Sequence, residues 1–109
     1  MLFLVELDHV KSGIVPTPET TRTFIEKIIF PTIARAEQLV AEKKILAGGP
    51  AMGRIALRFI LDVGSLQEAD RLVSSLPLWP LADTRITPLI AFADRRASVQ
   101  ALLEGLASR

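Results

Sequence analysis

The sequence predicts an α+β domain in which two helices cover one face of a four-stranded antiparallel sheet. Apolar and polar residues alternate over 2–10 and, most clearly, over 55–63, as they do in half-buried strands. Helical periodicity follows each of these segments, and further short strands are expected over 45–47 and 84–90. The resulting order, β-α-β-β-α-β, is the ferredoxin-like arrangement.

Length and composition indicate one domain that associates with copies of itself. The chain has 109 residues, and 50% of them are hydrophobic, which is at the upper end for a domain of this size. One copy therefore has more apolar surface than its own core can hide. The net charge of +1 gives no electrostatic reason to expect nucleic acid as a partner.

Cysteine content and apolar runs bear on localisation. The chain contains no cysteine, which suits a reducing compartment. Its apolar start, Met1–Val5, is short and lacks the basic residues of a secretory signal. No apolar run approaches the roughly 20 residues of a membrane span. We therefore expect a soluble cytoplasmic protein without a membrane partner.

The first strand and first helix each have a predicted core face. One face of the strand carries Phe3, Val5 and Leu7. The other face carries Leu2, Leu4, Glu6 and Asp8. Gly13 and Pro16 mark a loop, after which a helix is expected from its cap at Thr17 to about Lys44. Pro31 predicts a kink or a division of this helix. The predicted core stripe is Ile25, Ile29, Ile33, Ala36 and Val40, reinforced by Phe24 and Ile28.

Residues 45–63 predict a hairpin. Gly48-Gly49-Pro50 interrupts the second strand and, with Gly53, can form a bulge and a turn. This triplet does not lie between a strand and a helix, so it is not a phosphate loop. One face of the third strand carries Ile55, Leu57, Phe59, Leu61 and Val63. Its other face carries Ala56, Arg58, Ile60 and Asp62.

The last third of the chain predicts a helix, a strand and a helical extension. Ser65-Leu66-Gln67-Glu68 is typical of a capping box and opens a helix that ends at Pro77. The stripe of this helix is Leu66, Ala69, Leu72, Val73 and Leu76. Residues 97–107 predict a further short amphipathic helix. We divide the chain into a domain over 1–92 and a C-terminal helical extension over 93–109.

The second face of the sheet mixes apolar and charged residues. It carries Leu2, Leu4, Glu6, Ala56, Arg58 and Ile60. This mixture is too apolar for plain exposure to solvent and too charged for an ordinary core. Two copies that stack these faces would bury the apolar members and enclose the polar ones in a cavity. We therefore expect a homodimer, which could assemble into larger homo-oligomers, with a small-molecule ligand or substrate in that cavity.

Glu6 and Arg58 are the candidate catalytic residues, because each interrupts an otherwise apolar strand on this face. An enclosed carboxylate could serve as a general base, and an arginine could hold a substrate carboxylate through a bidentate contact. The alternative is that Glu6 and Arg58 simply pair with one another or with water. Leu4 and Ile60 would line the same cavity.

Three further residues have a structural and a functional interpretation. Asp83 is either a residue at the pocket mouth or a turn cap, and Trp79 is either a pocket wall or a core or interface anchor. His9 is the only histidine, and it is either a structural group or a proton shuttle. No cluster of metal-ligating residues accompanies it, so no metal is expected. Asp8 and Asp62 lie near strand ends, where capping is the expected role.

The segment Leu76–Leu89 resembles the LPLxP…D…VTPL signature near the C-terminal end of muconolactone Δ-isomerases. The start Met1-Leu2-Phe3-x-Val5-x-x-Asp8 and the segment from Gly53-Arg54 to Ser65 are also similar to that family. The resemblance implies a dimeric α+β barrel whose members form larger rings. It also implies isomerisation of muconolactone to the enol-lactone by movement of a double bond, without a cofactor.

The sequence departs from that family at three places. Leu4 stands where family members have a histidine, and Glu6 stands at a basic position. Gly48-Gly49-Pro50 replaces a tryptophan-rich strand and is more similar to YciI-like relatives, and Ala91-Phe92-Ala93 replaces a basic His-Pro ending. We therefore expect proton-shuttling isomerisation of a small lactone or aromatic-degradation intermediate. The alternative is a non-catalytic barrel that binds a small hydrophobic ligand or acts as an accessory protein.

Overall fold

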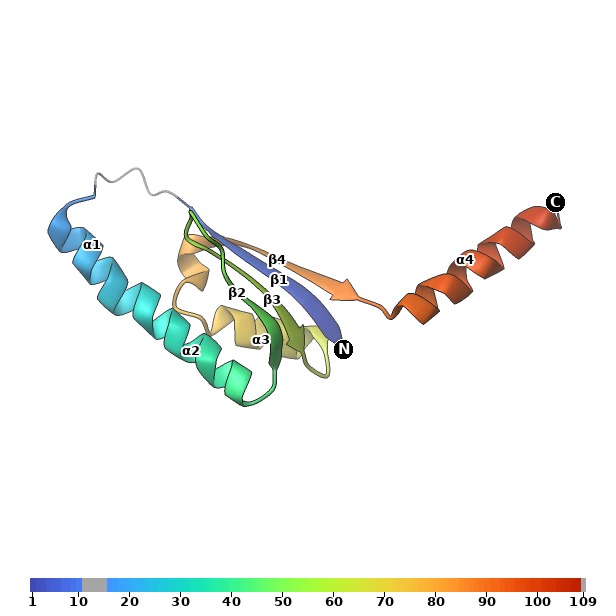
Figure 1. The fold of residues 1–109 in the computed structure, drawn as a ribbon, viewed down its shortest axis with the longest axis horizontal. Coiled ribbons are helices and arrows are strands. Elements are labelled where there is room, and N and C mark those ends of the chain that lie inside the picture. The colour runs from blue at the N-terminus through green and yellow to red at the C-terminus, as the bar shows by residue number, and fades with distance from the viewer. Residues whose placement is uncertain (11–15, 109) are drawn as a thin grey trace.

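The computed structural model describes residues 1–10 and 16–108, and it has a four-stranded antiparallel sheet with helices on one face (Figure 1). Gly13, placed in a loop by the sequence, lies outside the described residues. The strand order is β2-β3-β1-β4, which confirms the ferredoxin-like α+β fold. The elements are β1 (Leu2–His9), α1 (Pro18–Phe24), η1 (Ile25–Ile29), α2 (Phe30–Ala41), β2 (Ile45–Pro50), β3 (Ala56–Asp62), α3 (Leu66–Ser74), η2 (Trp79–Leu81), β4 (Ala82–Leu89) and α4 (Phe92–Ala107).

The core lies between the sheet and helices α2 and α3. Strand β1 is central, pairing antiparallel with β3 on one side and with β4 on the other. Its predicted inner residues are completely buried, and the inner residues of β3 lie beside them. The alternation in the sequence therefore predicted the inward faces of β1 and β3. The central members of this core are Phe3, Val5, Leu7, Leu57, Phe59, Leu61, Leu39, Ala69, Leu72 and Val73.

The first helix is divided ahead of Pro31 by a π-helical turn, η1, in which the backbone N–H of Phe30 donates to the carbonyl of Ile25. Proline lacks an N–H and crowds the carbonyl four residues earlier, and the wider turn relieves that crowding. Thr32 and Leu39 are buried, whereas Ile33 and Val40 are 38% and 54% exposed. The predicted stripe is therefore displaced by one residue at these positions.

The displacement has a geometric cause. Residues spaced by four drift about 40° around a regular α-helix at each step, so a long row of that spacing leaves the core face. The π turn takes more residues per turn and keeps Phe24, Ile28, Thr32 and Ala36 on one side. The neighbouring row of Ile25, Ile29 and Ile33, which looked more apolar in the sequence, lies at the edge of the core and is only partly buried.

Strand β2 continues through Gly48-Gly49-Pro50 instead of being interrupted there. A register shift between Ile45 and Ala47 provides the expected bulge. Gly48 has φ +120°, and a Cβ at this position would lie 2.2 Å from the carbonyl oxygen of Arg58, so only glycine fits. The turn itself follows β2 and includes Gly53 at φ +80°. Ile55 falls outside β3 and is 44% exposed, contrary to its predicted core role.

Helices α3 and α4 differ in how they meet the rest of the chain. The hydroxyl oxygen of Ser65 accepts the backbone N–H of Glu68 at 3.1 Å and caps α3, although Leu66 of the predicted stripe is exposed. Helix α4 begins earlier than predicted and projects away from the sheet with no buried residue (Figure 1). The radius of gyration is consequently 18.4 Å, compared with about 13 Å for a compact chain of this length.

Within residues 1–10 and 16–108, no helix combines the length and the apolar character needed to cross a bilayer.

Candidate functional site

The face of the sheet opposite helices α2 and α3 holds most of the predicted site residues. The strand register places Glu6 of β1 directly between Arg58 of β3 and Arg85 of β4. One step along β1, Leu4 lies between Ile60 and Thr87. Within the described chain no helix packs on this surface, which we call the open face (Figure 1). The structure therefore brings Glu6, Arg58, Leu4 and Ile60 together as predicted.

Arg58 is held by Asp8 and not by Glu6. One terminal nitrogen of its guanidinium donates to both carboxylate oxygens of Asp8, at 3.0 and 3.1 Å. The other terminal nitrogen donates to the backbone carbonyls of Leu57 at 2.9 Å and Leu7 at 3.4 Å. The pairing of Glu6 with Arg58 that the sequence left open is not formed. Four contacts fix the orientation of this guanidinium.

The sequence placed Asp8 on the face of Glu6 and predicted a capping role for it, and its pairing with Arg58 was missed. Asp8 lies two residues from Glu6 on the same face of β1, diagonal to Arg58 on the neighbouring strand. Diagonal neighbours across two antiparallel strands are within reach of long side chains. Arg54 adds a second cation at 4.0 Å from the Asp8 carboxylate. The alternation along β1 was a signal that Asp8 lies on the same face as Glu6, whereas its contact with Arg58 follows from the register between β1 and β3.

A polar hollow of about 520 Å³ lies beside Glu6 and is lined by Glu6, Asp8, Asp83, Thr84 and Arg85. Asp83 faces Asp8 across the β1–β4 pairing, at the end of the open face where Arg54 and Arg58 lie. Within the described residues, neither Glu6 nor Arg85 forms an ion pair within 4 Å. Both groups are therefore available to a bound molecule.

The remaining polar candidates have structural contacts. The ring of His9 packs against that of Phe24 with centroids 5.0 Å apart, and Asp62 accepts the N-terminal amino group of Met1 at 3.4 Å. In the described part of the chain, no three histidine, cysteine, aspartate or glutamate side chains gather as a metal site.

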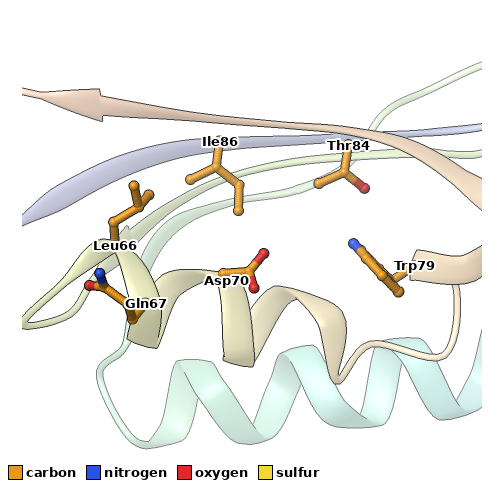
Figure 2. Close-up of a pocket in the computed structure, with 6 residues that line it drawn as sticks. All are labelled: Leu66, Gln67, Asp70, Trp79, Thr84 and Ile86. Carbon is orange, nitrogen blue, oxygen red and sulfur yellow. The ribbon is translucent and has the colours of Figure 1, made fainter.

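Trp79 does not join the other predicted site residues. It lies in η2, on the helix-covered side of the sheet, at one end of a cleft between α3 and β4 (Figure 2). Along β4, the side chains of Thr84 and Ile86 point toward this cleft, whereas those of Asp83 and Arg85 point to the opposite side. The prolines on either side of Trp79 set the path of the chain into η2.

The signature segment that contains Trp79 is anchored by its leucines. Leu76 and Leu78 are almost completely buried, and the backbone N–H of Leu78 donates to the hydroxyl of buried Thr32 at 3.0 Å. The segment therefore joins α2 to the start of β4. Trp79 itself is only partly covered, with 40% of the residue accessible.

Two apolar hollows lie along the other edge of the helical layer, between α2 and strands β2 and β3. Their volumes are about 180 and 190 Å³. Ile33, Pro50 and Leu57 line both of them. They are a third candidate region, with no charged pair at their centre.

The ferredoxin-like α+β fold of this chain is also found in solved structures of two enzymes. Muconolactone isomerase itself matches with a TM-score of 0.61 and 24% identity, over 84% of this chain and 90% of that chain. A 5-chloro-2-hydroxyhydroquinone dehydrochlorinase from Burkholderia phenoliruptrix, solved with 2,5-dihydroxybenzoquinone, matches with a TM-score of 0.62 and 21% identity. That match covers 86% of this chain and 98% of the other. At these identities the likeness establishes the fold.

No protein-family model and no curated protein matches this sequence.

Proposed function

We propose that this chain catalyses the cofactor-independent isomerisation of a small lactone or a related intermediate of aromatic degradation. The observation that carries the proposal is the position of Glu6 between two arginines on a sheet face that no helix covers. The structural neighbours support it, since one acts on muconolactone and the other was solved with a dihydroxylated quinone. Both compounds are small oxygenated rings.

In the proposed reaction Glu6 moves a single proton. Its carboxylate takes the proton from a carbon next to the conjugated system and returns it at the far end, so that the double bond shifts. The negative charge that develops on the substrate is stabilised by the guanidinium groups of Arg58 and Arg85. The same proton leaves and returns, and no oxidant, reductant or cofactor is consumed.

The arginines also orient the substrate. Arg58 is already fixed by Asp8 and by two backbone carbonyls, and the more exposed Arg85 can reach a substrate carboxylate in the polar hollow. Leu4 and Ile60 provide an apolar floor beside Glu6. Asp83 lies at the mouth of the hollow. These side chains would place the reacting carbon next to the Glu6 carboxylate.

We also propose that the chain works as a cytoplasmic homodimer in which a second copy covers the open face. Leu2 and Leu89 are 40% and 39% exposed there, and Leu4 and Ile60 are half-buried. Stacking two such faces would bury these apolar residues and enclose Glu6 between two sheets. Excluding water strengthens the charge interactions on which the proposed proton transfer depends.

The test follows the ultraviolet absorbance of muconolactone with purified protein and with an enzyme-free blank. Replacing Glu6 by Gln removes the base, so we expect turnover to fall about 100-fold or more. Asp62→Asn is the matched control, because Asp62 lies on the same face at the strand end and outside the proposed site. Unchanged turnover in the Glu6→Gln variant would remove Glu6 from the mechanism.

The second candidate function is the non-catalytic binding of a small hydrophobic ligand. The two apolar hollows that share Ile33, Pro50 and Leu57 favour it. An environment-sensitive dye, anilinonaphthalene sulfonate, should then fluoresce saturably with the wild-type protein and weakly with Ile33→Glu. Strong dye binding in the absence of muconolactone turnover would favour this function over isomerisation.

A further inference from the structure

Helix α4 carries an apolar face that its own chain leaves uncovered. None of its 16 residues is buried, and it projects away from the sheet (Figure 1). An isolated helix of this length is only marginally stable in water, because most helical stability comes from packing of an apolar face. Such a face is present on α4, and every member of it is more than half exposed: Phe92, Val99, Leu102, Leu103 and Leu106.

The two apolar hollows beside α2 form one unfilled groove of matching character. They share Ile33, Pro50 and Leu57, so they are continuous with one another. The wall opposite α2 is low, because β2 carries two glycines there and a Cβ at Gly49 would meet nothing within 4 Å. The wall that α2 and the preceding turn provide consists of Ile29, Ile33, Ala36, Glu37 and Val40.

The spacing of α4 fits this wall when the two helices run antiparallel. Both helices rise about 1.5 Å per residue, so one contact sets the others. With Val99 opposite Ile33, a step toward the start of α4 corresponds to an equal step toward the end of α2. The same register then gives two further apolar pairs, Phe92 with Val40 and Leu103 with Ile29. The apolar positions of the two helices therefore coincide along the groove.

The same register also brings opposite charges together. Arg95 lies opposite Glu37, and Arg96 follows it beside the apolar face. Among the described residues, none of these three forms an ion pair within 4 Å. A parallel helix would instead place Arg95 near Ile29, where the lining contains Arg54 and no acidic residue. Charge complementarity therefore selects the antiparallel orientation.

Helix α4 cannot enter the groove of its own chain. The groove lies at the β2 edge of the sheet, whereas α4 follows β4 at the opposite edge. The two edges are three strand spacings apart, or about 14 Å. Only Ile90 and Ala91 join β4 to α4, and the three backbone steps from Leu89 to Phe92 span about 11 Å when fully extended. The occupant of the groove must come from another copy.

We propose that α4 docks into the groove between α2 and β2 of a second copy, antiparallel to α2 of that copy. The groove lies on the helical side of the sheet, so this contact requires neither Glu6 nor pairing of the open faces. One short helix in one groove is a small interface compared with the roughly 1,200 Å² or more that stable complexes bury. The contact is therefore weak by itself and reinforces association made elsewhere.

Disulfide trapping tests the contact, because the chain contains no cysteine of its own. Full-length chains with Ile33→Cys are mixed at high protein concentration with full-length chains with Val99→Cys and oxidised mildly. We expect a disulfide between positions 33 and 99 of different chains, identified by mass spectrometry. Ala101→Cys is the matched control, since it lies about 200° around α4 from Val99. Equal rates of disulfide formation with Val99→Cys and Ala101→Cys would refute the docking.

Charge reversal tests the orientation. Adding Glu37→Arg to the Ile33→Cys chain should slow disulfide formation about two- to fivefold, because Arg95 and Arg96 would meet a like charge. Adding Arg95→Glu and Arg96→Glu to the other chain should restore the rate. All three residues are exposed, so the melting temperatures should not change. A rate that Glu37→Arg leaves unaltered would overturn the antiparallel arrangement.

A Leu4→Arg background separates this contact from the proposed dimer. Leu4 lies on the opposite side of the sheet from the groove, so the disulfide between positions 33 and 99 should still form. Its loss in that background would show that the contact is not a separate one. Absence of the disulfide from the original pair, together with saturable binding of anilinonaphthalene sulfonate, would assign the groove to a small ligand and refute the docking.

Discussion

The two faces of the sheet are built from the same strands and differ in almost every other respect. Along β1, Phe3, Val5 and Leu7 are fully buried under the helices, whereas the residues between them are only partly covered. The covered face is held by packing, which tolerates neither charge nor empty volume. The open face carries Glu6 and two arginines and lacks a covering element. The difference indicates that one face specifies the fold while the other is free for chemistry and association.

The largest expected effect tests this contrast directly, by truncation of adjacent residues on opposite faces. Phe3→Ala should lower the free energy of unfolding by about 3–5 kcal/mol, since it leaves a cavity in the core. Leu4→Ala should lower it by less than about 1.5 kcal/mol in the isolated chain, because Leu4 is only half-buried. Urea unfolding of both variants measures the difference. Equal losses would mean that the faces are not distinct.

A second contrast lies within β2, between two adjacent glycines. Gly48→Ala forces a Cβ to 2.2 Å from a backbone oxygen at φ +120° and should cost about 2–3 kcal/mol of stability. Gly49→Ala meets nothing within 4 Å and should change stability by a few tenths of a kcal/mol. Thermal melts of the two variants provide the comparison. A neutral Gly48→Ala would show that the bulge geometry is wrong.

A smaller effect is expected where the signature segment joins the covered face. Thr32→Val leaves the buried N–H of Leu78 without its acceptor, so we expect a loss of about 1–3 kcal/mol. The matched control is Thr23→Val, on the exposed side of α1. Denaturant unfolding distinguishes them. A loss of the same size in the control would assign the effect to helix propensity instead of the hydrogen bond.

The smallest effect concerns α4, which belongs to neither face. Ending the chain at Ala91 removes a helix with no buried residue, so the unfolding free energy of the isolated domain should change by less than about 0.5 kcal/mol. Light scattering of the same variant shows whether α4 contributes to assembly. A loss above about 2 kcal/mol at low protein concentration would show that α4 packs on its own domain.

The strands were predictable because alternation has a period of two and one face is uniformly apolar. Phe3, Val5 and Leu7 could therefore be placed without knowledge of what covers them. The first helix was less predictable, since two apolar rows lie one residue apart. The π turn before Pro31, which no periodicity rule anticipates, decides which row is buried.

The candidate site was predictable in its members on β1 and β3 and less so elsewhere. Glu6 and Arg58 face the same side because both strands alternate regularly. The Asp8–Arg58 pair depends on the register between strands, which the sequence does not state. Trp79 lies on the opposite side because η2 turns the chain before β4 begins at Ala82. Such a turn depends on tertiary contacts of Leu76 and Leu78.

We propose that a second copy covers the open face, and the mass of the particle in solution is the decisive measurement. Light scattering should give the wild-type protein a mass of at least two chains. Leu4→Arg places a charge in the middle of that face and should give one chain with an unchanged circular dichroism spectrum. Thr23→Arg, on the exposed side of α1, should keep the wild-type mass. A single-chain mass for the wild type, or an unaltered mass for Leu4→Arg, would contradict the claim.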